Sequence, residues 1–340
     1  MKKIKIEDAV GMILGHDVTQ IIPGKYKGPR FKRGHLIREE DIPEFLKIGK
    51  EYIYVMDLKV GMIHEDDAAF RLGQAFSSEN IEFFGPSEGK MTFRSKTNGL
   101  LKINLPLLHR INSSGNIILS TLHRYTPCKP EMAIGATRII SLTTLERQIE
   151  KVENWCKKYG PVVEVLPYRM LNIGVVVTGN EFFHGRTEDR FDDKVGKKIV
   201  DFDSRVLKKR IVPDDISQIS NVLSELKDEP VDLILVTGGL SIDPDDVTRA
   251  GIKKAGTRII FYGTPVLPGA MFLYGRLGEK PVLGLPACVF YHKATLFDII
   301  FPKLLAGGSP NRREISLLGH GGFCRNCERC HFPICPFGKG

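Results

Sequence analysis

Short apolar runs alternate with stretches of helical periodicity over the second half of the chain. Residues 172–178 and 231–236, Asn-Ile-Gly-Val-Val-Val-Thr and Val-Asp-Leu-Ile-Leu-Val, have the length and composition of buried parallel strands. The alternation continues through the segments 203–210, 214–227, 247–254, 258–262, 281–285 and 289–305. This pattern predicts an α/β domain with a mainly parallel sheet over residues 170–310.

The first half of the chain is patterned differently and predicts two smaller units. Residues 39–49 have the spacing of a helix closed by Gly49, and Tyr52-Ile-Tyr-Val is typical of a strand. Helices are also expected at 66–76 and 144–158, with short β runs between 85 and 144 and a loop at 23–34. The expected organisation is a small N-terminal α+β unit (1–56), a β-rich accessory domain (57–168), the α/β domain (170–310) and a Cys-rich tail (311–340).

Composition narrows the class of protein. No apolar run in the 340 residues approaches the roughly 20 residues of a membrane helix, and the N-terminus lacks the apolar core of a signal peptide. We therefore expect a cytoplasmic protein without a membrane segment. The net charge of +9 is spread along the chain, which suits a small anionic ligand as well as nucleic acid, and nucleic acid is the least favoured partner.

The segment that follows residues 231–236 is the most informative for function. It reads Thr237-Gly-Gly-Leu-Ser-Ile-Asp-Pro-Asp-Asp-Val-Thr248. A Gly-Gly turn after a strand exposes backbone N–H groups to an anion, and the neighbouring carboxylates suit a divalent cation. A purely structural turn with an Asp cap would have the same residue types, so this segment alone leaves both interpretations open.

Further motifs of this kind follow one another along the α/β domain. In chain order they are Thr178-Gly179-Asn180-Glu181, Asp203-Ser204, Pro213-Asp214-Asp215, Thr237-Gly238-Gly239-Leu240-Ser241, Asp246 and Pro268-Gly269. Their order resembles the molybdopterin-binding domain of the MogA, MoeA and gephyrin-type molybdenum cofactor biosynthesis proteins, over about residues 171–306. The resemblance implies a three-layer α/β fold with molybdopterin as the ligand.

The resemblance also implies residue roles. Asp246, Asp214 and Glu181 occupy the places of the family's essential carboxylates. The pterin and its phosphate would contact Thr178, Gly179, Asn180, Asp203, Ser204, Thr237, Gly238, Gly239, Leu240, Ser241, Pro268, Gly269 and Pro286. The family's chemistry is adenylyl transfer to molybdopterin or metal insertion into the adenylated pterin, with Mg²⁺ as the expected cation.

A second hypothesis is a pterin carrier or an iron- or redox-responsive sensor without catalysis. Many family members read Gly-Leu-Pro-Gly-Asn-Pro where this chain reads Gly284-Leu-Pro-Ala-Cys-Val289, and this difference favours the carrier. Whether the chain is an enzyme therefore stays open. Expected partners are molybdopterin or its adenylated form, molybdate or tungstate, an acceptor molybdo- or tungstoenzyme, and further copies of this chain.

Four of the seven cysteines lie close together near the C-terminus, as Cys324-x-x-Cys327-x-x-Cys330-x₄-Cys335-Pro336. In a reducing compartment such a cluster indicates metal binding rather than disulfides. The C-x₂-C-x₂-C run and the final Cys-Pro favour an iron–sulfur cluster, although the last gap is longer than in bacterial ferredoxins. Tetrahedral Zn²⁺ is the alternative. It is the less favoured of the two, because zinc sites more often use two separated Cys pairs.

Overall fold

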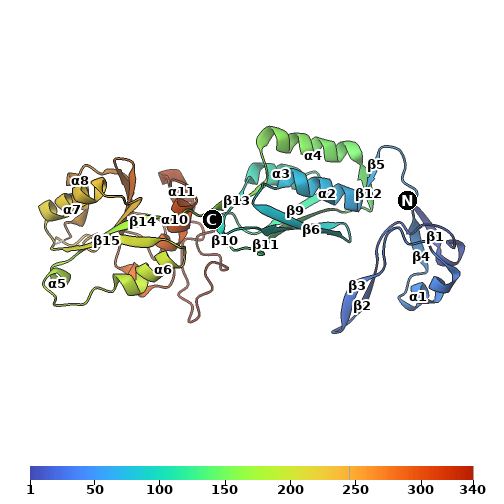
Figure 1. Cartoon of the computed structure of the whole chain (residues 1–340), viewed down its shortest axis with the longest axis horizontal. Coiled ribbons are helices and arrows are strands. Elements are labelled where there is room, and N and C mark those ends of the chain that lie inside the picture. Colours follow the sequence, from blue (N-terminus) through green and yellow to red (C-terminus); the bar gives the residue numbers. More distant parts are fainter. Residues whose placement is uncertain (245, 340) are drawn as a thin grey trace. The chain divides into compact units, whose positions relative to one another are not determined.

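The structure is a computed structural model that describes residues 1–244 and 246–339. It contains two compact units, and the chain passes between them more than once. The first unit contains Met1–Thr97, Lys102–Leu122 and Lys129–Val165; the second contains Asn98–Leu101, His123–Cys128 and the chain from Leu166 onward. Figure 1 labels many of their elements. No helix formed by the described residues has the length and apolar character needed to cross a bilayer.

The N-terminal part of the first unit is a small α+β arrangement. Its elements are β1 (Lys2–Lys5), η1 (Ile6–Asp8), β2 (Val18–Ile22), β3 (Tyr26–Phe31), η2 (Glu39–Asp41), α1 (Ile42–Lys47) and β4 (Tyr52–Val55). The expected helix and strand are confirmed, and β1 pairs with β4. The expectation of a loop at 23–34 was wrong, because β3 pairs with β2 as a hairpin. The rings of Phe31 and Phe45 stack 4.0 Å apart in the core of this part.

The rest of the first unit is mostly β-structure. Its elements, which extend into segments of the second unit, are β5 (Met62–His64), α2 (Glu65–Phe76), β6 (Ile81–Ser87), β7 (Lys90–Ser95), β8 (Gly99–Ile103), α3 (Leu105–Asn112), β9 (Ile117–Thr121), β10 (Pro127–Cys128), β11 (Ala133–Ile139), β12 (Thr143–Leu145), α4 (Glu146–Tyr159) and β13 (Val163–Pro167). Strands β6-β7-β11-β9 form an antiparallel sheet. Helix α3 was not expected from the sequence. It begins after Asn104, whose side chain accepts a hydrogen bond from the N–H of Leu107.

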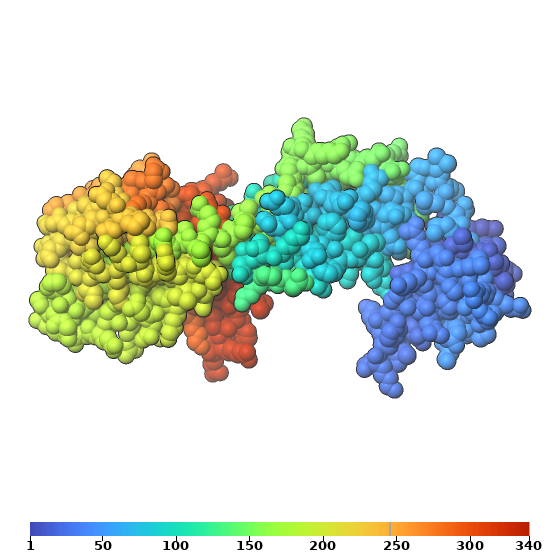
Figure 2. Space-filling model, viewed as in Figure 1, coloured from blue at the N-terminus to red at the C-terminus, as the bar shows by residue number. Residues whose placement is uncertain are grey.

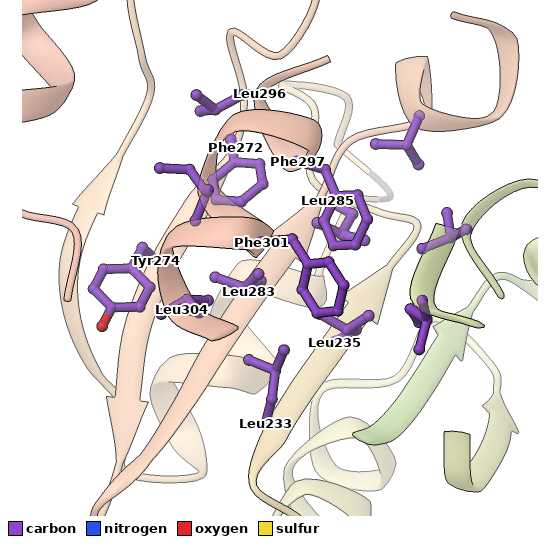
Figure 3. Close-up of a cluster of buried hydrophobic side chains, with 14 of the residues drawn as sticks. Leu233, Leu235, Phe272, Tyr274, Leu283, Leu285, Leu296, Phe297, Phe301 and Leu304 are labelled. Atoms are coloured by element: carbon purple, nitrogen blue, oxygen red, sulfur yellow. The ribbon is translucent and has the colours of Figure 1, made fainter. Parts of the chain in front are cut away.

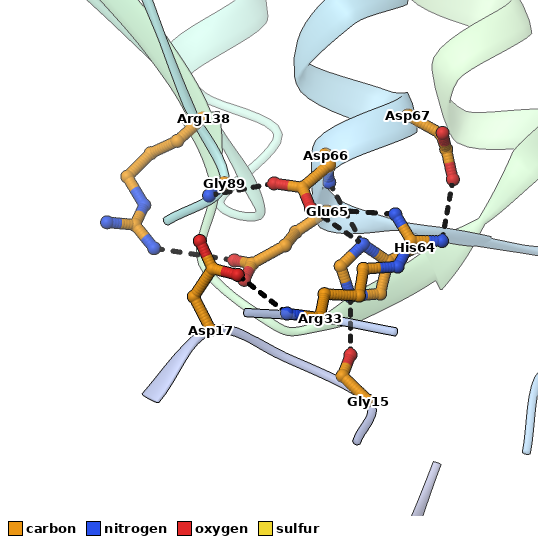
Figure 4. Close-up of polar contacts among 9 residues, drawn as sticks. All are labelled: Gly15, Asp17, Arg33, His64, Glu65, Asp66, Asp67, Gly89 and Arg138. Atoms are coloured by element: carbon orange, nitrogen blue, oxygen red, sulfur yellow. Dashed lines mark hydrogen bonds and ion pairs between the residues drawn. The ribbon is translucent and has the colours of Figure 1, made fainter. Parts of the chain in front are cut away.

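A buried polar cluster joins the N-terminal part to the start of α2 (Figure 4). His64 is 1% exposed; its Nε2 donates to the carbonyl of Gly15, 2.9 Å away, and its Nδ1 accepts from the N–H of Asp66. Arg33 forms an ion pair with Asp66 at 3.5 Å. Glu65 is also buried, and burial, with the nearby Asp66 charge, raises the pKa of Glu65 to about 7.

The second unit contains the α/β domain. Its elements are β14 (Asn172–Thr178), α5 (Asn180–Phe183), η3 (Asp192–Gly196), α6 (Lys197–Val200), β15 (Arg205–Val212), α7 (Ile216–Asp228), β16 (Leu233–Thr237), α8 (Thr248–Lys254), β17 (Arg258–Tyr262), β18 (Leu273–Leu277), β19 (Lys280–Leu285), α9 (Cys288–Tyr291), α10 (Leu296–Leu305) and α11 (Arg312–Leu317). The sheet order is β15-β14-β16-β19-β18-β17. The first four strands are parallel, and β18 is antiparallel to both of its neighbours. The expectation of a mainly parallel sheet is confirmed.

Helices cover both faces of this sheet, which gives three layers (Figure 1). Along β14, Val175 and Val177 pack into a core with residues of α10, whereas Val176 packs into a second core with residues of α7. The continuous apolar run therefore reflects burial on both faces. Figure 3 shows the α10 side, where Phe297 and Phe301 lie over the sheet with their rings stacked 5.0 Å apart. The three-layer α/β fold is confirmed.

Candidate functional site

The parallel strands end at the same level, and this brings the predicted loops to one edge of the sheet. The register pairs Thr178 with Val212, Val177 with Thr237, and Thr237 with Leu285. The loops after β14, β15, β16 and β19 therefore leave the sheet side by side. We call this the carboxyl edge, because the carboxyl ends of the parallel strands lie here, and it is the edge where α/β proteins usually bind ligands. Strand β17 runs in the same direction, so the loop that carries Pro268 and Gly269 also lies at this carboxyl edge.

The loops after β14 and β15 are joined directly. The N–H of Asn180 donates to Oδ2 of Asp214 at 2.9 Å, and the N–H of Asp214 donates to Oδ1 of Asn180 at 3.3 Å. The N–H of Gly179 also bonds to the carbonyl of Val212. Glu181 follows in the first turn of α5 and is exposed. Asp214 and Glu181 thus belong to two adjacent loops of the carboxyl edge.

The Gly238-Gly239 turn after β16 packs closely on the end of β14. Gly238 has φ +92°, and a Cβ there would lie 2.2 Å from the carbonyl oxygen of Thr178, so only glycine fits. The hydroxyl of Thr178 is 3.1 Å from the carbonyl of Thr237 and 2.7 Å from the hydroxyl of Thr248. Thr178 is 1% exposed, so its hydroxyl holds loops together. Thr248 was missed by sequence reasoning, because its contact joins residues far apart in the chain.

The side chain of Thr237 is in a different situation. It is 1% exposed, and within residues 1–244 and 246–339 its hydroxyl oxygen has no hydrogen-bond partner. A buried hydroxyl without a partner costs free energy. Thr237 directly precedes the Gly238-Gly239 turn, so this hydroxyl is a candidate for contact with a bound ligand or water.

Asp246 shapes the rest of the loop after β16. Its Oδ2 accepts a hydrogen bond from the N–H of Ser241 at 2.6 Å, and the side chain is half-buried. Leu240 is buried in the core, and its carbonyl accepts from the hydroxyl of Tyr262 at 2.7 Å. Tyr262, at the end of β17, is a second supporting residue that the sequence did not reveal. Leu240 anchors the loop, while Ser241 is exposed.

Two further loops complete the edge. The carbonyl of Pro268 accepts from the N–H of Leu296 at 3.3 Å, and a Cβ on Gly269 would lie 2.8 Å from Cβ of Leu296. The Pro268-Gly269 turn is therefore seated on the start of α10. After β19, the carbonyl of Pro286 accepts from Val289. Cys288 is half-buried, and burial raises the pKa of its thiol.

Asp203 and Ser204 are not brought to this edge. The hydroxyl of Ser204 accepts a hydrogen bond from the N–H of Leu171, which precedes β14, and β15 begins at Arg205. Both residues therefore lie at the amino ends of the parallel strands. The physical reason is that β14 and β15 are parallel, so the chain between them, which contains η3 and α6, returns to the amino ends of the strands before β15 begins. Their role in binding the pterin stays a prediction without support from their position.

The four tail cysteines line one pocket of about 390 Å³. Cys327 is exposed, and Cys324, Cys330 and Cys335 are partly buried. In the part of the chain that the structure describes, no three His, Cys, Asp or Glu side chains are grouped as ligands of one ion. This holds for the tail cysteines and for the carboxylates of the carboxyl edge alike. The structure thus gathers the cysteines around a cavity without arranging them about a single point.

Comparisons with known proteins identify separate parts of the chain. Residues 174–306 match a family described as a "probable molybdopterin binding domain", and residues 3–57 match a domain of unknown function. A molybdopterin molybdenumtransferase of Haemophilus influenzae is 25% identical over 150 residues, 42% of this chain and 37% of that protein. A CinA-like protein of Citrifermentans bemidjiense is 32% identical over 90 residues, 26% of this chain and 22% of that protein.

One solved structure that is similar to this chain is the CinA protein of unknown function from Thermoplasma acidophilum, with 21% identity and a TM-score of 0.35. The match covers 40% of this chain and 98% of the CinA chain. The chain matches well under half of the length of the two curated relatives.

The fold, the loops of the carboxyl edge and the family match define the class of this domain. Residues 174–306 carry a domain of the family described as probable molybdopterin-binding domains. The resemblance inferred from the motifs is confirmed for this domain. The Cys-rich tail lies outside the matched residues.

Proposed function

We propose that this chain binds molybdopterin at the carboxyl edge of its six-stranded sheet and acts in the assembly of a molybdenum or tungsten cofactor. The observation that carries the proposal is the Gly238-Gly239 turn beside the buried hydroxyl of Thr237, which has no hydrogen-bond partner among the described residues. Backbone N–H groups and a hydroxyl are the donors that a pterin phosphate requires. The relatives named for molybdopterin chemistry support the same ligand.

The proposed reaction is adenylyl transfer to molybdopterin or metal insertion into it. Asp246 and Asp214 would hold Mg²⁺ or orient the metal oxyanion through water, with Glu181 supporting them. Carboxylate oxygens are the ligands that a hard cation prefers. Asp246 and Asp214 also accept hydrogen bonds from backbone N–H groups, which fix the loops that carry them. Mg²⁺ would neutralise phosphate charge, and the protein would position the reactants. Asp203 and Ser204 are not assigned a part in this step.

The alternative is a carrier or sensor that holds the pterin without turning it over. The Ala287-Cys288-Val289 sequence after β19 favours it, since this loop belongs to the same edge and lacks the residues common in the family. In that case the tail cysteines would bind an iron–sulfur cluster or Zn²⁺ that reports the metal or redox state. Delivery to an acceptor enzyme, and self-association, are proposed for either function.

The test begins with anaerobic purification, release of bound pterin, and titration of the wild-type chain with molybdopterin. Asp246→Ala should then bind pterin but lose turnover by at least a hundredfold in the presence of ATP or molybdate with Mg²⁺. Asp243→Ala, an exposed carboxylate of the same loop, is the matched control and should keep turnover. Pterin binding without any turnover in the wild type would establish the carrier, and no pterin binding would refute the proposal.

A further inference from the structure

The Cys-rich tail is docked on the loop that carries Pro268 and Gly269. The N–H of Leu267 donates to the carbonyl of Gly322, and the N–H of Cys324 donates to the carbonyl of Leu267, both at 2.8 Å. Leu267 and Phe323 thereby form a parallel β-bridge. The backbone of Cys324, the first tail cysteine, is thus hydrogen-bonded to Leu267, which directly precedes the Pro268-Gly269 turn.

A second link joins the tail to the loop after β19. Nδ1 of His292 lies 3.0 Å from Oδ1 of Asn326, which stands between the first two tail cysteines. The N–H of Gly338 bonds to the carbonyl of Gly321 at 2.9 Å and closes the tail into a loop. Phe337 is 4% exposed and belongs to the α10 core. Figure 2 shows the tail, in red, at the surface of the protein.

The pocket between the tail and the loop after β19 is lined by residues suited to a metal site with thiolate ligands. Its lining includes all four tail cysteines together with His292, Lys293, Arg325 and His331. Among the described residues, no Asp or Glu lines it. Four thiolates around a metal centre carry net negative charge, which the neighbouring Lys and Arg would offset. Cys128 and Cys156 lie outside this pocket and are buried in the protein, and burial raises the pKa of their thiols to about 12 and about 11.

We propose that Cys324, Cys327, Cys330 and Cys335 hold one metal centre through four thiolates, and that this centre fixes the Leu267–Gly269 segment and thereby sets the affinity for the pterin. The proposal rests on the proposed function for its ligand. Binding requires the four thiols to release their protons as the metal–sulfur bonds form. With the centre in place, the bridge between Leu267 and Phe323 is held from the tail side.

Two kinds of metal centre use four cysteine ligands, an iron–sulfur cluster and a single zinc ion. A zinc ion needs four sulfurs at about 2.3 Å from one point, whereas an iron–sulfur cluster is larger and spreads its ligands around itself. The four cysteines line a pocket of about 390 Å³, so either centre would be held from the walls of this pocket. Both centres share tetrathiolate ligation, so the experiment separates them by metal content and absorption spectrum.

The coupling follows from the contacts at Pro268 and Gly269. The Pro268 carbonyl accepts a hydrogen bond from the first residue of α10, and a Cβ at Gly269 would collide with Leu296, so α10 holds one side of this segment and the tail holds the other. Releasing Cys324 frees the other side of the same segment. Coupling between two sites is reciprocal and typically amounts to about 5- to 150-fold in affinity. Pterin should therefore also retain the metal centre.

The experiment uses the full chain, loaded anaerobically with Fe³⁺, a thiol that reduces part of this iron to Fe²⁺, and sulfide or, in a parallel sample, with Zn²⁺. Metal per chain and the visible spectrum are measured before and after chelation. Molybdopterin affinity and amide exchange of the peptide spanning 263–272 are then compared between the two states. We expect one stoichiometric centre, a fivefold or greater loss of affinity on its removal, and faster exchange of the Leu267 amide.

The variant Cys324→Ser/Cys330→Ser should reproduce the metal-free state, and Cys156→Ala, outside the pocket, should behave as the wild type. Circular dichroism checks that each variant is folded. No stoichiometric metal after either loading, or unchanged affinity and exchange after its removal, would overturn the inference. A wild-type chain that holds the centre but binds no pterin in either state would refute the proposed function and the coupling, while the metal site would stand on its own measurement.

Discussion

Asn180 and Asp214 are joined by two hydrogen bonds that run in opposite directions. Each residue donates its backbone N–H to the side chain of the other, at 2.9 Å and 3.3 Å. Since Asn180 follows β14 and Asp214 follows β15, the pair fixes two loops of the carboxyl edge together. The Asp214 carboxylate therefore has a structural duty in addition to the proposed role with a cation.

The two duties of Asp214 can be separated. Asp214→Asn keeps an oxygen acceptor for the Asn180 N–H and removes the charge, so the free energy of unfolding should change by no more than about 0.5 kcal/mol. Turnover with Mg²⁺ should fall about a hundredfold, because the charge is lost. Asp214→Ala should also lower the free energy of unfolding by about 1 kcal/mol, through the lost hydrogen bond. Chemical denaturation and steady-state rates check both results; equal turnover of Asp214→Asn and wild type would contradict the role.

The close approach of Gly238 to Thr178 predicts a large cost for a side chain. Gly238→Ala combines a positive φ with a Cβ 2.2 Å from a carbonyl oxygen. Gly256→Ala is the matched control, because Gly256 has φ +85° and no atom within 4 Å of its Cβ. The control should lose about 1 kcal/mol and Gly238→Ala at least about 3 kcal/mol in urea denaturation. Equal losses would show that the contact with Thr178 is not decisive.

The hydroxyls of Thr178 and Thr237 differ in their partners and should respond differently to removal. Thr178→Val breaks contacts to the Thr237 carbonyl and the Thr248 hydroxyl, and should destabilise the domain by about 1–3 kcal/mol. Thr237→Val removes a hydroxyl without a partner among the described residues, so stability should be unchanged or slightly higher. Molybdopterin affinity should nevertheless fall in Thr237→Val. Titration of both variants decides this, and an undiminished affinity of Thr237→Val would exclude its hydroxyl from the ligand site.

Glu65 makes the first unit sensitive to pH. Burial and the nearby Asp66, with smaller contributions from Asp17 and Glu88, raise the pKa of Glu65 from 4.5 to about 7, against the opposing charge of Arg138. The folded state therefore holds the proton more tightly than the unfolded state. The contribution of Glu65 to the free energy of unfolding is complete below pH 4.5 and is lost as the pH rises toward about 7. Over this range the free energy of unfolding falls by up to about 1.4 kcal/mol per pH unit.

Glu65→Gln should remove this slope, because an amide resembles the protonated acid. Free energies of unfolding for wild type and variant, measured at intervals between pH 5 and pH 8, provide the comparison. The two curves should diverge as the pH rises, with the variant more stable at pH 8. Parallel curves would show that Glu65 titrates near its ordinary pKa.

The α/β domain could be predicted because its strands are buried on both faces. The sequence predicts a strand at residues 172–178, and β14 has the same bounds. A short run that is mostly apolar is typical of a parallel strand buried on both faces. Strand β18, Leu-Tyr-Gly-Arg-Leu, was missed. Its Gly275 and Arg276 interrupt the apolar pattern, and its position depends on antiparallel pairing with β19.

The carboxyl-edge loops could be predicted for a related reason: parallel strands place the residues that follow them at one edge. Asp203 and Ser204 could not be placed, because the segment before them contains η3 and α6, whose mixed polar sequence did not indicate a helix. Thr248 and Tyr262 were missed because their importance lies only in hydrogen bonds to Thr178 and Leu240. Such contacts are made by the fold and leave no local pattern.

The strand order also affects how the chain can be made. β19 lies inside the sheet, between β16 and β18, although it is the last strand of the sheet in the chain. During synthesis, β16 therefore has an unpaired edge until residues 280–285 leave the ribosome. Unpaired strand edges attract other chains, and nascent domains fold as units. We therefore expect a translation pause between β16 and β19 to expose this protein to aggregation more than a pause after β19.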